Sequence, residues 1–148
     1  MMQMKRRIKL FFMLVIVVFL CILSSCYALS DTARMISYYS EPSNYVAATG
    51  TVIHIAYAED FESLYLGISD TSYRFDDVNF VIEGKNLEIV REAGIDDVLK
   101  IGDTVTFSVA PKYWGDGYCI PLVAISTGDD VFLRIEEGVP NLLEWLRS

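Results

Sequence analysis

The chain has 148 residues, of which 53% are hydrophobic, and this length allows one domain with a hydrophobic core but not two. All 20 Asp and Glu residues follow residue 25, whereas four of the 12 Lys and Arg residues precede it, so residues 26–148 carry a formal charge of 8 − 20 = −12. Because nucleic-acid binding depends on basic surface, a domain this acidic is not expected to bind nucleic acid.

The first 26 residues form three successive parts. Four Lys and Arg residues lie within residues 5–9, an unbroken apolar run covers residues 10–23, and Ser24-Ser25-Cys26 follows. A basic start, a short apolar core and small residues at the end are typical of a secretory signal peptide. The alternative is an uncleaved membrane anchor, but the apolar run has 14 residues, fewer than the roughly 20 that a membrane-spanning helix needs.

The ending Leu23-Ser24-Ser25-Cys26 resembles the lipobox of bacterial lipoproteins. This resemblance implies that a diacylglyceryl group is joined to the sulfur of Cys26 and that the chain is cut just before it. Residues 1–25 are then the signal peptide. The mature protein begins at a lipidated Cys26 and is held on the extracytoplasmic side of the cell membrane.

Residues 26–43 precede the predicted domain and have two interpretations. Ser30 is a suitable N-cap for a short helix, with Asp31 in its first turn, and Pro42 ends that helix. The other interpretation is a disordered tether between the lipid and the domain.

From residue 44 onward the pattern is mainly that of β-strands separated by turns. Gly50 lies inside the first strand, where glycine typically marks a bend or a bulge, and Pro121 indicates an edge or a bulge in the fifth. The fourth strand alternates most regularly, with Val105, Phe107 and Val109 directed inward. The predicted strands cover residues 45–57, 63–69, 78–83, 104–110, 118–126 and 131–135.

Two helices are predicted within this strand-rich region. Asn86 is a suitable cap for a helix over residues 87–93, and Gly94 ends or kinks it. Pro140 is well placed as the first residue of a C-terminal helix that continues over residues 141–147.

The order of these elements resembles the OB-fold, a five-stranded Greek-key barrel with a helix between strands 3 and 4. The features that carry the resemblance are Gly50 in strand 1, the helix at 87–93, and Lys100-Ile-Gly-Asp-Thr-Val105 at the start of strand 4. We therefore expect a mainly β protein. Residues 44–148 are expected to form a five-to-six-stranded OB-like barrel with a short C-terminal helix.

The residues that carry chemistry in other proteins are sparse here. His54 is the single histidine, and nothing in the sequence brings it to Cys119, which we expect to be a small buried residue of a strand. Paired acidic residues occur in several turns, but none matches a calcium-binding loop. No catalytic residue, metal site or cofactor is predicted. A small envelope hydrolase or a calcium-dependent protein built on the acidic loops remains the alternative.

Aromatic and acidic residues are concentrated in two predicted loops that border the binding face in OB-folds. Aromatic faces beside carboxylates attract cationic or amphipathic groups. In the alternative interpretation, Trp114 in one of these loops fills the end of the barrel. The candidate binding residues are Tyr113, Trp114 and Tyr118 in the strand 4–5 loop, and Glu59, Asp60 and Glu62 in the strand 1–2 loop.

The sequence thus predicts an extracytoplasmic lipoprotein that is anchored to the membrane through Cys26. Its domain is expected to act as a non-catalytic binding or accessory module. The expected partner is a protein, a peptide or an envelope glycan rather than nucleic acid.

Overall fold

The computed structural model describes residues 13–18, 21, 31–75, 79–112 and 119–148. By their contacts the residues divide into two units, Met1–Met35 and Ile36–Ser148, which are described separately. In the first unit residues 13–18, 21 and 31–35 are helical. None of the helices among the described residues is both long enough and apolar enough to cross a membrane. The predicted lipid-attachment residue, Cys26, lies outside the described residues.

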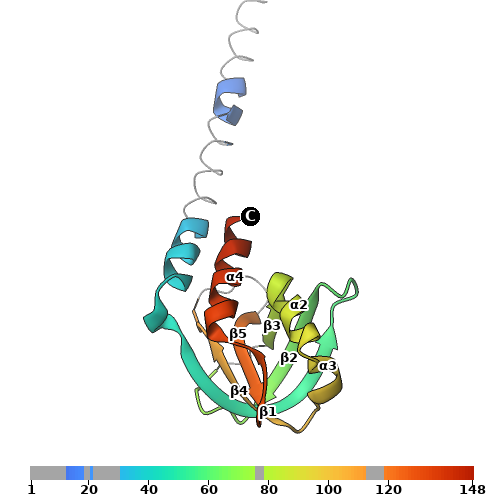
Figure 1. Cartoon of the computed structure of the whole chain (residues 1–148). Helices are drawn as coiled ribbons and strands as arrows, with labels where there is room; N and C mark the ends of the chain where they lie inside the picture. The colour runs from blue at the N-terminus through green and yellow to red at the C-terminus, as the bar shows by residue number, and fades with distance from the viewer. Residues whose placement is uncertain (1–12, 19–20, 22–30, 76–78, 113–118) are drawn as a thin grey trace, which may run out of the picture. The chain divides into compact units, whose positions relative to one another are not determined.

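The second unit contains a closed five-stranded barrel (Figure 1), and one additional strand pairs with the last strand of this barrel. The strand order is β3-β2-β1-β4-β5-β6, in which neighbours are antiparallel, and a parallel pairing of β3 with β5 closes the barrel. This topology confirms the predicted OB-like Greek-key barrel. The strands are β1 (Val46–Tyr57), β2 (Ser63–Ser69), β3 (Asn79–Glu83), β4 (Thr104–Val109), β5 (Cys119–Thr127) and β6 (Asp130–Leu133).

Strand β1 is long because it serves both halves of the barrel. Its residues 46–51 pair with β4, and its residues 51–57 pair with β2. Gly50 lies at this change of partner, where a Cβ atom would come within 2.9 Å of the Ser69 carbonyl oxygen. Glycine is therefore required for the close approach of β2, while the irregularity in the β1–β2 register lies between Val52 and His54.

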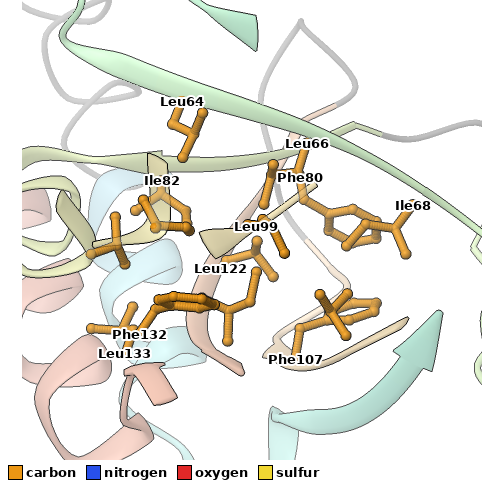
Figure 2. Packing of buried hydrophobic residues seen from close by; sticks show 14 of the residues in the cluster. Leu64, Leu66, Ile68, Phe80, Ile82, Leu99, Phe107, Leu122, Phe132 and Leu133 are labelled. Carbon is orange, nitrogen blue, oxygen red and sulfur yellow. The ribbon is translucent and has the colours of Figure 1, made fainter. Parts of the chain in front are cut away.

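The core fills the barrel interior and is built from alternating strand residues (Figure 2). Val105, Phe107 and Val109 are all buried, which confirms the inward face predicted for β4. The ring of Phe107 lies 4.9 Å from that of Phe80 and 6.0 Å from that of Phe75, centroid to centroid. Such aromatic packing adds to the stabilisation from buried apolar area.

The helix between β3 and β4 is present, as predicted. It is α2 (Gly84–Glu92), and the short helix α3 (Ile95–Val98) follows it. Gly94 separates the two helices with a φ of +82°, a left-handed conformation that suits glycine and ends α2.

The predicted role of Asn86 as a helix cap is wrong. Asn86 lies inside α2, is buried, and donates a hydrogen bond of 3.0 Å to the Gly138 carbonyl oxygen. Its own side-chain oxygen accepts a hydrogen bond of 2.9 Å from Asn141. A buried amide needs such partners, so this pair of bonds joins α2 to the C-terminal helix.

The C-terminal helix α4 (Ile135–Arg147) begins before Pro140, which lies inside it instead of at its first position. In the first turn of α4, which precedes Pro140, the amides of Glu137 and Gly138 donate hydrogen bonds to the Arg134 carbonyl oxygen. Gly138 is buried against the backbone of β5, and α4 contacts β5 (Figure 1). Packing on the sheet thus extends the helix beyond the start that proline alone indicates.

The residues just before β1 are packed into the second unit. Residues 36–39 are helical and the 3₁₀ helix η1 (Pro42–Asn44) follows, so helical structure is present in this part of the predicted 26–43 segment. Tyr39 is fully buried, donates to the Lys112 carbonyl oxygen, and accepts at its own carbonyl from the Tyr45 hydroxyl. Burial raises the pKa of the Tyr39 hydroxyl.

Candidate ligand-binding pocket

The turn between β1 and β2 holds an aromatic side chain out in solvent. The Phe61 amide donates to the Ala58 carbonyl oxygen, and the Glu62 amide donates to the Asp60 carboxylate. Phe61 itself has a φ of +60°, an uncommon conformation for a bulky residue, and 63% of it is exposed. The turn therefore presents Phe61 to solvent in a strained backbone conformation, a feature often found at binding sites.

Arg91 of α2 supports this turn. Its guanidinium donates a hydrogen bond of 2.8 Å to the Phe61 carbonyl oxygen and lies 4.7 Å from the centroid of the Tyr57 ring. The Tyr57 hydroxyl in turn donates to the Asp96 carboxylate. Partial burial, followed by this hydrogen bond, raises the pKa of Tyr57. Arg91 thus ties the exposed turn to α2, and Tyr57 ties the end of β1, next to the turn, to α3.

Beside the turn lies a pocket of about 420 Å³, a volume within the range of small-ligand sites. Residues 60–63 form one wall, α2 contributes Glu88 and Arg91, and α4 contributes Trp145. Trp145 is 47% exposed. The position of α4 therefore affects the side of the pocket that Trp145 forms, and the bonds of Asn86 with Gly138 and Asn141 join α4 to α2.

The charges that line the pocket are predominantly negative. Asp60, Glu62, Glu83 and Glu88 carry four negative charges against the single positive charge of Arg91, which gives −4 + 1 = −3. One oxygen of Glu83 accepts a hydrogen bond of 2.7 Å from Ser63.

The structure brings together only some of the residues predicted to form a binding site. Asp60 and Glu62 line the pocket, and Glu59 is an exposed residue of the same turn. The predicted aromatic residues Tyr113, Trp114 and Tyr118 lie outside the described residues, so their approach to the acidic turn stays a prediction.

The strand register places the residues that directly follow the two predicted loops at opposite ends of β3. The acidic turn leads into Ser63, which pairs with Glu83, whereas the strand 4–5 loop leads into Cys119, which pairs with Asn79. The aromatic residues that the structure places beside the acids are instead Phe61 and Trp145. Phe61 could have been singled out as an aromatic residue within a polar turn. Trp145 gives no such signal, because its position results from tertiary packing.

The residues considered for catalysis are separated. His54 is exposed on β1 opposite Gly67, whereas Cys119 is half-buried on β5 opposite Asn79. Cys119 is less buried than predicted, and partial burial raises the pKa of its thiol. Among the described residues, no three His, Cys, Asp or Glu side chains lie close enough together to hold a metal ion.

Comparison with known proteins does not suggest a function, so the pocket is the basis for inferring one. No protein family and no curated protein matches the sequence.

Proposed function

We propose that this protein is a lipid-anchored extracytoplasmic lipoprotein whose barrel acts as a non-catalytic binding module for a protein, peptide or envelope glycan. The observation that carries the binding role is the pocket, in which an exposed, strained Phe61 and the half-exposed Trp145 lie among carboxylates. Large exposed aromatic side chains at a concave, charged surface are the residues that most often dominate binding energy.

The membrane anchor rests on the N-terminal sequence. The basic start, the apolar run and the Leu23-Ser24-Ser25-Cys26 ending support export followed by lipidation at Cys26. The strong negative charge of residues 26–148 suits this location, because repulsion from anionic lipid head groups keeps a domain away from the membrane surface. The same charge argues against nucleic acid as a partner.

The anchor predicts a clear outcome for Cys26→Ser. The variant is expected to lose labelling by a radioactive or clickable fatty acid and to retain its signal peptide, because the thiol that receives the lipid is absent. Labelling in cells and the intact mass of the purified protein measure the two effects. A wild-type protein that is cut elsewhere and has an unmodified Cys26 would contradict the proposal.

The binding role predicts that Phe61→Ala weakens partner binding by about 2 kcal/mol, or roughly 30-fold, as expected for a central aromatic contact. The same substitution is expected to lower the free energy of unfolding by less than about 1 kcal/mol, because the ring is largely exposed. Quantitative cross-linking and affinity capture from the protein's own cells, with wild type and variant in parallel, measure the first effect. Chemical denaturation measures the second.

Ile101→Ala is the matched control, because Ile101 is a large apolar residue with a similar exposure of 67% and does not line the pocket. It is expected to retain every partner that wild type captures. If Phe61→Ala and Ile101→Ala retain the same partners equally well, the pocket is not the binding site.

A further inference from the structure

The pocket that carries the proposed function also indicates the chemistry of its ligand. We infer that it receives an arginine or lysine side chain from a basic segment of a protein or peptide partner. This inference rests on the proposed binding role and narrows its ligand classes to a basic segment of a protein or peptide. Its basis is the combination of a cavity of about 420 Å³, two aromatic walls and a net charge of −3 in the lining.

The carboxylates are the first part of the argument. Asp60, Glu62, Glu83 and Glu88 line one cavity, and their charges attract a cation that enters it but not a neutral group. Arg91 offsets only one of the four charges. Its guanidinium is also engaged with the Phe61 carbonyl oxygen and the Tyr57 ring, so it is held at the wall of the pocket.

The aromatic residues are the second part. Phe61 and Trp145 line the same cavity, and a guanidinium or ammonium group is attracted to the face of an aromatic ring. The contact between Arg91 and Tyr57 shows this geometry within the protein itself, at 4.7 Å. An incoming arginine has the same two ways to bind, by stacking on a ring and by forked hydrogen bonds to a carboxylate.

The same features argue against a neutral glycan and against an acidic peptide. A neutral sugar stacks well on aromatic rings but gains nothing from the negative charge of the four carboxylates. An acidic peptide is repelled by that charge. A basic side chain is the ligand whose binding lowers the electrostatic energy of the empty pocket.

The test uses fluorescein-labelled hexapeptides of alternating glycine and arginine, glycine and lysine, or glycine and glutamate, together with a labelled N-acetylglucosamine tetramer. Fluorescence anisotropy with the full-length lipoprotein in detergent is expected to show binding of both basic peptides but not of the other two probes. Raising the salt concentration from about 0.01 M to about 0.15 M is expected to weaken this binding several-fold, because it shortens the Debye length from about 30 Å to about 8 Å.

Two isosteric variants locate the interaction. Glu62→Gln combined with Glu88→Gln removes two pocket charges. This double variant is expected to weaken binding of the arginine peptide at least about tenfold, because the negative pocket then complements the positive peptide less well. The control is Asp129→Asn combined with Asp130→Asn. It makes the same change in net charge at two exposed residues outside the pocket, the last residue of the turn before β6 and the first residue of β6, and is expected to weaken binding less than about twofold.

The outcomes separate this inference from the proposed function. Equal loss of peptide binding in both double variants, preferential binding of the sugar or glutamate probe, or no binding of the basic peptides would overturn the inference. If partner capture nevertheless still depends on Phe61, the binding module stands with a different ligand. If capture is independent of Phe61 as well, both fail.

Discussion

Phe107→Ala is expected to lower the free energy of unfolding by about 3–5 kcal/mol, which is a large part of the 5–15 kcal/mol typical of a small domain. Phe107 is buried in β4, and its ring packs against those of Phe80 and Phe75 at the centre of the barrel. The substitution leaves a cavity between strands that hydrogen bonds hold in place, so the surroundings can relax only partly. Urea denaturation followed by circular dichroism measures the change.

Thr106→Ala is the matched control because Thr106 is the preceding residue of the same strand and faces solvent. It is expected to cost less than about 1 kcal/mol, mainly through a lower preference for the strand conformation. Similar denaturation midpoints for the two variants would mean that the face of β4 assigned to the core is wrong.

The barrel could be predicted from the sequence because its signals are local. The alternation of β4 has a period of two residues, and the same alternation places Leu64, Leu66 and Ile68 in the core. Gly94 marks the end of α2 for a reason that depends only on its own backbone, its positive φ. The order of strands and helix then leaves few ways to close the sheet.

The contacts of the helices could not be predicted in the same way, because they depend on residues far apart in sequence. Asn86 is a residue type typical of a helix cap, but its hydrogen-bond partners are Gly138 and Asn141, more than 50 residues away. Pro140 is a residue type typical of a helix start, yet the helix begins at Ile135, and α4 packs on β5 through Gly138. In both places tertiary packing outweighs local preference.

The pocket combines both kinds of information. Its acidic turn could be found from the sequence, because charged residues between two strands predict an exposed loop, and Asp60 and Glu62 do line the cavity. Arg91 and Trp145 could not be found, because the tertiary packing of α2 and α4 brings them to the turn. A site assembled from a turn and two helix faces has no sequence motif of its own.

Gly138→Ala is expected to destabilise the protein by about 3 kcal/mol, at the upper end for an overpacked contact. A Cβ atom at Gly138 would clash with the Val123 carbonyl oxygen and lie 2.7 Å from its carbonyl carbon, so α4 must move away from β5. That movement strains the hydrogen bond from the buried Asn86 amide to Gly138. Because Trp145 is on the same helix, peptide binding to the pocket should weaken as well.

The sign of this effect is diagnostic. In an exposed helix, replacing Gly with Ala increases stability by about 1 kcal/mol through helix propensity alone. Glu137→Ala, at the neighbouring exposed position of α4, is expected to cost less than about 1 kcal/mol. Denaturation midpoints of wild type and the two variants decide between packing and propensity. If Gly138→Ala is as stable as wild type or more so, α4 does not pack on β5 through Gly138, and the wall that Trp145 contributes to the pocket has to be reassigned.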